Sequence, residues 1–301
     1  MKEKEFINII KSVLNSSYIG DDCAYLKKSG IVITQDNLVE NIHFRRDFMT
    51  PYQLGWKSAM VNISDICASG AKPSCLTVGL SLPADIDEDF VREFYKGLKD
   101  ASDGVEIVGG DITGADKIFI SVAAIGSAEG RMISSRKNAK AGQKIIISGL
   151  HGSSAAGLRL LMKGEKEPQK FISAHLMPGA QTEFSEKIAL NIKEDYAMMD
   201  TSDGLMDAIS QIADASGVNI EIDFSKIPFD EDLKMFEDYE DLILFGGEDY
   251  GLVASVSEEF ARDFTVIGEV KQGEGITLLF DDGQKKHFSK QDVEERIFNH
   301  F

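Results

Sequence analysis

The sequence is poor in the residues that hold soft metals and cross-link chains. Its three cysteines, Cys23, Cys67 and Cys75, form no C-x-x-C pair, and its five histidines are scattered without an H-E-x-x-H motif. Structural zinc sites and disulfide frameworks need such spacings. We therefore exclude both, and we expect the cysteines to be free thiols in a reducing compartment.

Basic residues are also scarce, since 32 Lys and Arg stand against 50 Asp and Glu, a formal net charge of −18. A protein that grips a nucleic-acid backbone needs the opposite balance. No apolar run is long enough to span a bilayer. The N-terminal segment "MKEKEFINIIKSVL" follows a helical period and does not resemble a signal peptide. We expect a cytoplasmic protein that binds neither nucleic acid nor membrane.

The common nucleotide-binding and hydrolase motifs are missing as well. Gly152–Arg159, "GSSAAGLR", has two glycines at Walker A spacing, but leucine and arginine replace the Lys-Ser/Thr pair. This favours close helix packing over a phosphate-binding loop. The chain contains no G-x-G-x-x-G fingerprint, no kinase catalytic-loop triplet and no G-x-S-x-G elbow. The usual phosphate-binding folds and the serine hydrolases are therefore disfavoured.

What the chain does contain is an alternation of strand and helix patterns in both halves. The apolar spacing predicts helices over about 52–69 and over "DEDFVREFYKGLKDAS", and strands over "IVITQDNLV", "VEIVGGD" and "KIFISVAAIG". A chain of 301 residues is long for one core. The polar stretch 130–142 separates two domains, which we predict at 1–137 and 138–301, of mixed α/β or α+β class.

Aspartates recur at the boundaries between these elements. Asp36 ends a strand, Asp111 follows a glycine pair, and Asp200 closes an apolar run just before a helix. A single such aspartate is usually a turn former or a helix cap. The same context recurs at Asp21, Asp22, Asp36, Asp65, Asp111, Asp200 and Asp203.

Buried carboxylates repel one another, and a cation must neutralise them. Magnesium suits this pattern because it prefers oxygen ligands and is typically held by a few carboxylates together with nucleotide phosphates. The sequence therefore predicts a magnesium site that seats a triphosphate.

Several longer segments carry a family resemblance. They are "GDDCAYL", "ITQDNLVENIHF", "GWKSAMVNISDICASGAKP", "VGGDITG", "GSSAAGL", "MDTSDGL", "SGVNIEID" and "FGGEDYGL". Their order and spacing, over about 19–252, resemble the thiamine-monophosphate kinase family of the aminoimidazole ribonucleotide synthetase superfamily. The "GGD" and "SDGL" motifs occur across the superfamily, whereas "NIHF" and "GGEDY" point to this member.

The resemblance implies both an activity and a fold. Members of the family transfer the γ-phosphoryl group of ATP to thiamine monophosphate, which gives thiamine diphosphate. The implied fold is an N-terminal α/β domain followed by a C-terminal α+β sandwich. Two N-terminal domains pair into a β-barrel across a homodimer, and the nucleotide lies in a cleft near that interface. The implied cofactor is Mg²⁺, as several ions, with ATP as co-substrate.

The resemblance also implies a set of site residues. The implied magnesium ligands are Asp22, Thr34, Gln35, Asp36, Asp65, Asp111, Asp200 and Asp203. The implied nucleotide contacts are Tyr95, Gly110, Asp111, Arg136 and Ser202. The implied substrate contacts are His43, Glu248 and Phe298.

The chemistry of these residue types agrees with the implied roles. The accepting phosphate oxygen is already anionic at neutral pH, so the reaction needs positioning and charge neutralisation and no general base. Glu248 suits a cationic thiazolium or an aminopyrimidine. His43 suits a hydrogen bond to the substrate, and Phe298 suits stacking on a ring of thiamine.

Three positions depart from the family pattern. Gln35 replaces a threonine before the strand-end aspartate, so that the ligand there is either its amide or a backbone carbonyl. Gly251 replaces the second glutamate of "GEDYEL", and "GAQ" follows Pro178 where the family has an arginine. The magnesium set is intact, and the departures concern mainly the substrate side.

Besides an acidic globular protein whose acids are all solvated, which the recurrent context of the aspartates argues against, two other interpretations remain open. One is another ATP-using enzyme of the superfamily with a different acceptor, although such enzymes typically carry a glycine-rich or cysteine-bearing N-terminal segment. The other is a non-catalytic nucleotide-binding relative, against which the near-complete aspartate set argues.

Overall fold

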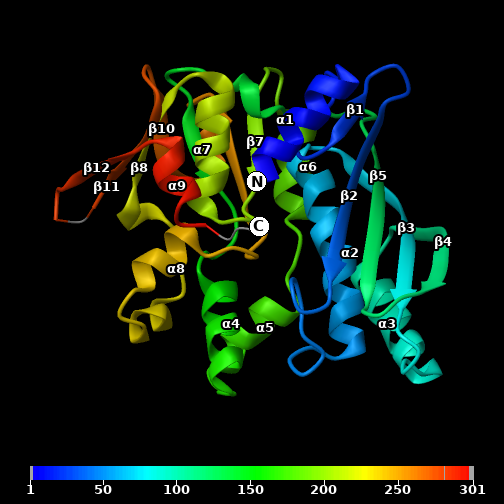
Figure 1. The fold of residues 1–301 in the computed structure, drawn as a ribbon. Coiled ribbons are helices and arrows are strands. Elements are labelled where there is room, and N and C mark those ends of the chain that lie inside the picture. Colours follow the sequence, from blue (N-terminus) through cyan, green and yellow to red (C-terminus); the bar gives the residue numbers. More distant parts are fainter. Residues whose placement is uncertain (1–2, 281, 298–301) are drawn as a thin grey trace.

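The structure is a computed structural model that describes residues 3–280 and 282–297. Its strands form two separate sheets, one in each half of the chain (Figure 1). Within the described part, every helix is too short or too polar to cross a lipid bilayer. Phe298 lies outside the described residues.

The first sheet has five strands in the order β1-β2-β5-β3-β4, and only β3 and β4 run parallel. Three helices accompany it in the sequence. The elements are α1 (Glu3–Leu14), β1 (Ala24–Leu26), β2 (Ile31–Val39), α2 (Pro51–Ala68), β3 (Lys72–Leu82), α3 (Glu88–Ala101), β4 (Glu106–Gly114) and β5 (Phe119–Ser127).

The second sheet has seven strands in the order β12-β11-β8-β10-β6-β9-β7, with only β8 and β11 parallel. Its strands are β6 (Lys144–Ile147), β7 (Ala197–Asp200), β8 (Asn219–Asp223), β9 (Leu252–Val256), β10 (Thr265–Lys271), β11 (Gly275–Leu279) and β12 (Lys285–Phe288). The helices of this half are α4 (Ser153–Lys163), α5 (Gln169–Leu176), α6 (Thr182–Asn191), α7 (Leu205–Ser216), α8 (Tyr239–Phe245) and α9 (Lys290–Glu294). Short 3-10 turns lie at Arg136–Asn138, Phe224–Lys226, Glu231–Met235 and Phe260–Asp263.

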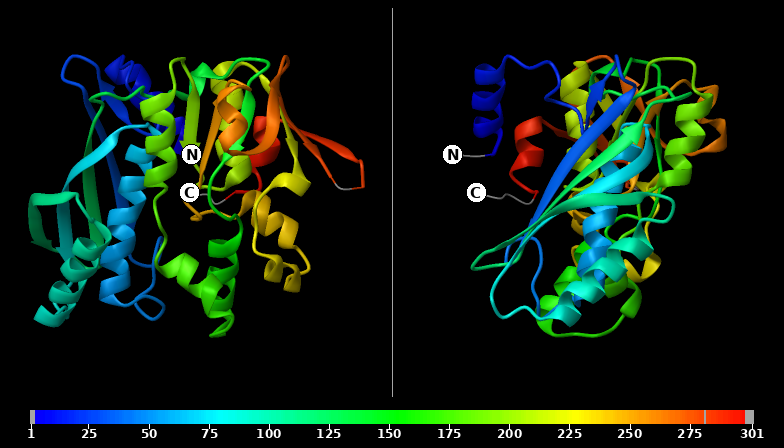
Figure 2. Two further views of the ribbon diagram at one scale, coloured as in Figure 1. Left: turned by 180° about the vertical axis from the view of Figure 1, so that it is seen from behind. Right: turned by 90° about the vertical axis from the view of Figure 1, so that its right-hand side faces the viewer.

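Helix α2 occupies the junction of the two halves (Figures 1 and 2). It begins with a capping box in which Thr50 and Gln53 satisfy each other's backbone amides, and Pro51 stands in its first turn. The helix contacts the first sheet on one side and β7, α5 and α6 on the other. Because it is covered from both sides, it is buried nearly all round and carries no single apolar stripe.

The two edges of the first sheet are β1 and β4, so the sheet stays open within the described residues. Every residue of β4 except Ile107 is exposed, and Val108 and Ile112 are 55% and 61% exposed. A closed barrel would therefore need strands from a second copy of the chain.

The expectation of a mixed α/β architecture in both halves is confirmed by the two sheets. The helix expected at about 52–69 is Pro51–Ala68, and the expected N-terminal helix is α1. The helical period of α1 does not bury its apolar face, because Ile9, Val13 and Leu14 are more than half exposed. Periodicity identified this helix, but it did not reveal that the helix packs so little against the rest of the chain.

Candidate functional site

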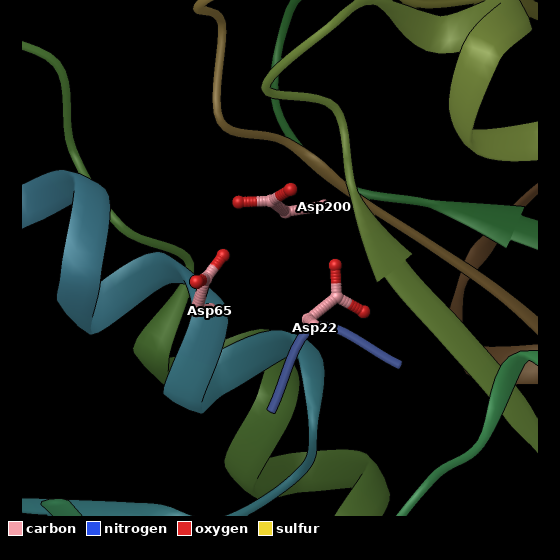
Figure 3. Close-up of side chains that lie close together, drawn as sticks. All are labelled: Asp22, Asp65 and Asp200. Atoms are coloured by element: carbon pink, nitrogen blue, oxygen red, sulfur yellow. The ribbon is translucent and has the colours of Figure 1, made fainter. Parts of the chain in front are cut away.

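Three aspartates from distant parts of the chain bring their carboxylates together (Figure 3). Asp22 lies in the turn before β1, Asp65 in the last turn of α2, and Asp200 at the end of β7. One carboxylate oxygen of each lies within 4.8 Å of those of the other two. We call these three residues the aspartate cluster.

The central position of α2 explains why the three aspartates meet. Ser64 precedes Asp65 on this helix, and its hydroxyl donates a hydrogen bond of 2.6 Å to Oδ2 of Asp200. On the other side, Oγ1 of Thr34 on β2 lies 2.6 Å from Oδ2 of Asp65. The helix thus joins the middle of β2 to the end of β7, one strand from each sheet.

Among the described residues, Arg136 is the cation that faces the cluster. Nη2 of Arg136 donates a hydrogen bond of 2.8 Å to Oδ1 of Asp22, and a second guanidinium nitrogen bonds to Gln211. The buried Nε of Arg136 has no hydrogen-bond partner within the described residues. A single guanidinium leaves the three carboxylates with an excess of negative charge.

Burial and mutual repulsion make the carboxylates hard to ionise. Burial, and then the charge of Asp22, raise the pKa of Asp200 to about 7 and that of Asp36 to about 6. Burial, followed by the charges of Asp36 and Asp200, raises the pKa of Asp65 well above its usual range. Ionised carboxylates at this spot therefore require a cation.

The donor set fits magnesium. Its atoms are carboxylate oxygens, which a hard divalent ion prefers, and buried like charges favour any ion that neutralises them. The position of Asp65 adds to this preference, because the C-terminal end of a helix repels a negative charge. Soft thiolate ligands play no part, since the Sγ of the buried Cys23 bonds to the carbonyl oxygen of Asp65.

Magnesium is expected to stabilise the chain more at about pH 8 than at about pH 5. Carboxylates whose folded pKa is raised favour folding while they are protonated. That contribution is complete below the unfolded pKa and is lost as the pH rises through about 6 for Asp36 and about 7 for Asp200. Metal binding reverses this loss most where the groups are ionised.

Thermal unfolding with and without about 10 mM MgCl2 at the two pH values measures the effect. Potassium chloride of equal ionic strength is the control for screening. An equal shift of the midpoint at both pH values would contradict the assignment of the cation to the aspartate cluster.

The other predicted magnesium ligands lie at different distances from the cluster. The side chain of Asp36 is directed toward the same region, and its backbone N–H donates to Oδ1 of Asn62 at 3.1 Å. Asp203 is exposed in the loop that follows β7. Asp111 is exposed on the edge strand β4, which three strand spacings, roughly 14 Å, separate from β2.

Gln35 is directed to the opposite face of β2 from Thr34, as strand alternation requires. Its Nε2 donates to Oγ of Ser121 at 2.9 Å, on the side of the sheet away from α2. The amide of Gln35 is thus engaged elsewhere, and of the two alternatives for this position the backbone carbonyl is the one that remains.

The predicted nucleotide residues fall into two groups. Arg136 and Ser202 adjoin the cluster, and the hydroxyl of Ser202 donates to Oδ1 of Asp200 at 2.8 Å. Gly110 lies on the edge strand β4, and Tyr95 lies on α3, which packs against α2. Gly110 has a φ of +156°, and a Cβ there would meet the carbonyl oxygen of Val78 at 1.9 Å, so only glycine fits.

The two described substrate residues lie close to each other. Nδ1 of His43 accepts a hydrogen bond of 2.9 Å from the backbone N–H of Val39, so the neutral ring carries its proton on Nε2. Burial alone would raise the pKa of Glu248, but the ammonium of Lys57 and then the nearby imidazoles of His175 and His43 lower it below its usual range. Glu248 is therefore an ionised carboxylate in the neighbourhood of His43.

Sequence reasoning missed three residues of this neighbourhood: Ser64, Lys57 and His175. The wholly buried Lys57 lies 2.9 Å from Oε1 of Glu248, and His175 lies 3.2 Å from Oε2. The available signal was a lysine inside the apolar pattern of α2, since an unpaired lysine is almost never fully buried.

The glycine segment before α4 is occupied by the chain itself. Asp249 accepts hydrogen bonds of 2.6 and 2.8 Å from the backbone N–H groups of Gly152 and Ser154. Gly157 packs against α5, where a Cβ would meet the carbonyl oxygen of Phe171 at 2.0 Å. The interpretation of this segment as close helix packing agrees with these contacts.

Comparison with known proteins supplies the family. The domain family described as AIR synthase related protein, N-terminal domain, matches residues 20–128, and the corresponding C-terminal domain family matches residues 140–281. Thiamine-monophosphate kinase of Aquifex aeolicus is 38% identical and covers 98% of this chain and 96% of that protein. The enzyme of the same name from Bacillus subtilis is 36% identical, with 94% and 93% covered.

A solved structure shares the whole fold. AaThiL complexed with AMPPCP and TMP superposes with a TM-score of 0.87 and 36% sequence identity. The similarity covers 100% of this chain and 97% of that one. With two matching domain families and relatives of nearly equal length, the chain belongs to the thiamine-monophosphate kinase family of AIR synthase related proteins.

Proposed function

We infer that the chain transfers the γ-phosphoryl group of ATP to thiamine monophosphate and so makes thiamine diphosphate. The observation that carries this function is the adjacency of the aspartate cluster and Glu248. The backbone N–H of Glu248 donates to the carbonyl oxygen of Ser202 at 2.7 Å, and the hydroxyl of Ser202 reaches Asp200. A site for phosphates and a carboxylate for a cationic ring thus lie side by side.

The residues of the site suit this reaction without a general base. The accepting phosphate oxygen is anionic at neutral pH, so no side chain has to remove a proton. When bound, Mg²⁺ neutralises phosphate charge and orients the transferred group. Arg136 adds a fixed positive charge, and its unpaired Nε–H is available to an anionic oxygen. Nε2–H of His43 is a donor for the acceptor, and Glu248 is an anion for its thiazolium.

We assign the magnesium ligands in two groups. The first comes from one copy of the chain and consists of Asp22, Thr34, Asp36, Asp65, Asp200 and Asp203, with Gln35 through its carbonyl oxygen. The second is Asp111, which lies beside Gly110 on the exposed edge strand β4. Because one chain keeps these groups roughly 14 Å apart along the sheet, the second group reaches the cluster of another copy.

This assignment requires a homodimer in which two first sheets close into a barrel. The open edges β1 and β4 provide unpaired backbone groups for such closure. Small residues such as Gly79, Ser121 and Ala123 line the face away from α2, which suits the inside of a narrow barrel. Domain limits of 1–137 and 138–301 fit this arrangement, since β5 ends at Ser127 and β6 begins at Lys144.

An assay with ATP and thiamine monophosphate, with and without MgCl2, tests the function directly. Thiamine diphosphate and ADP are expected in equal amounts, and only with the metal. ADP formed only with another acceptor would favour a different enzyme of the superfamily. ATP binding in calorimetry without turnover of any acceptor would favour a non-catalytic relative.

Replacing His43 by alanine is expected to weaken acceptor binding. Loss of the Nε2–H donor should raise the Michaelis constant for thiamine monophosphate by about 10-fold, with little change for ATP. Initial rates at varied concentrations of each substrate measure the two constants. The matched control is His287→Ala on the exposed strand β12. A raised constant for ATP alone would contradict the assignment of His43.

A further inference from the structure

The charged side chain of Lys57 is buried away from solvent. It projects from α2 and is 0% exposed, one of the largest fully buried side chains in the chain. Its Nζ lies 2.9 Å from Oε1 of Glu248 and donates to the carbonyl oxygen of His175 at 3.4 Å. Both partners belong to the second half of the chain, so this ammonium bridges the junction of the two halves.

Glu248 is held from several sides yet stays partly accessible. Its backbone is in the left-handed region, with a φ of +66°, and is tied to Ser202. Its second oxygen lies 3.2 Å from Nδ1 of His175, and its side chain is 29% exposed. The inner side of the carboxylate is therefore occupied by protein groups, and the outer side is open to a ligand.

His175 is a neutral neighbour of Glu248. Burial, and then the charge of Lys57, lower the pKa of His175 to about 4. Its Nδ1 lies 3.1 Å from Oγ of Ser154, its hydrogen-bond partner, and 3.2 Å from Oε2 of Glu248. Of these two neighbours of Glu248, Lys57 is the one that carries a full positive charge.

We propose that Lys57 is a positioning residue that holds the carboxylate of Glu248, across the junction of the two halves, against the cationic ring of the acceptor. Lys57 is fully buried and does not touch the acceptor itself. It fixes one oxygen of Glu248, so that the remaining lone pairs face the open side. This inference rests on the proposed function, because the cationic ring is that of thiamine monophosphate.

The test compares Lys57→Met, Glu248→Gln and the double variant with the unaltered chain. Lys193→Met, which removes an exposed lysine, is the matched control. Lys57→Met is expected to raise the Michaelis constant for thiamine monophosphate at least about 10-fold and to leave that for ATP within about twofold. Because Lys57 acts through Glu248, the double variant should bind the acceptor no more weakly than Glu248→Gln alone.

The possible results distinguish a failure of this inference from a failure of the proposed function. If the unaltered chain makes thiamine diphosphate normally and Lys57→Met has an unchanged Michaelis constant for thiamine monophosphate, the inference is overturned and the proposed function stands. Absence of thiamine diphosphate with the unaltered chain overturns both. Should Lys57→Met fail to fold, the double variant removes both charges and decides: an acceptor constant equal to that of Glu248→Gln supports the inference, and a much higher one overturns it.

Discussion

Asp200→Asn is expected to lose at least about 100-fold in turnover while the metal-free protein becomes more stable. The loss follows from the removal of one carboxylate from the aspartate cluster. The gain in stability follows because burial and neighbouring charges raise the pKa of Asp200 to about 7, so its ionisation at higher pH opposes folding. Asparagine keeps the shape without the charge.

The size of this gain is a balance of two effects. Relief of repulsion favours the variant, whereas asparagine has one acceptor oxygen for the hydroxyls of Ser64 and Ser202, which now bond to separate oxygens of Asp200. We expect a net increase of about 2 kcal/mol in the free energy of unfolding at about pH 8 without metal.

Urea unfolding in the presence of a chelator, together with the kinase assay, measures both quantities. The control is Asp195→Asn, at an exposed position shortly before β7. This substitution should change neither the turnover nor the free energy of unfolding. Destabilisation with turnover preserved would show that Asp200 is a structural acid and not part of an ion site. Added MgCl2 should narrow the difference in stability, because it stabilises the unaltered chain more.

Asp111→Asn and Asp65→Asn are each expected to be inactive alone and to restore activity when combined in one dimer. If Asp111 completes the site of the other copy, a mixed dimer has one site with both substitutions and one site with neither. Random pairing makes half of the dimers mixed, so about a quarter of normal turnover should return. If Asp111 served the site of its own chain, each site of a mixed dimer would lack one ligand.

Co-expression of the two variants with different affinity tags allows the mixed dimer to be purified and assayed. The control pairs Asp22→Asn with Asp65→Asn, which lie in the same cluster and should not complement each other. A mixed Asp111 and Asp65 dimer as inactive as its parents would contradict the assignment across the dimer. A monomer in sedimentation experiments would contradict the barrel as well.

Much of the fold was accessible from local patterns. The apolar spacing placed α2 within one residue of its ends, and strand patterns located β2, β4 and β5. Periodicity reports which side of an element is apolar, but not what covers it. It therefore gave no warning that α1 leaves apolar side chains exposed, or that α2 is covered on both sides.

The candidate site, too, could be predicted from the sequence only in part. The aspartates were visible because polar residues that end apolar runs stand out from their surroundings. The prediction that Asp36 and Asp111 end their strands was wrong, because β2 continues to Val39 and β4 to Gly114. Their grouping was not visible, because it depends on which strands are neighbours. Asp22, Asp65 and Asp200 converge, whereas Asp111 lies on an edge strand on the far side of the first sheet. The amide of Gln35 looked like a ligand until strand alternation placed it beside Ser121.

The sequence by itself determined the chemistry that this protein has available: hard oxygen ligands in number, few basic residues, and family motifs over most of its length. Only the tertiary structure decided how those groups combine. It buried Lys57 against Glu248 and drew three carboxylates within 4.8 Å of one another. The physical reason is that composition and spacing act along the chain, whereas desolvation and charge repulsion act through space, between residues that only folding brings together.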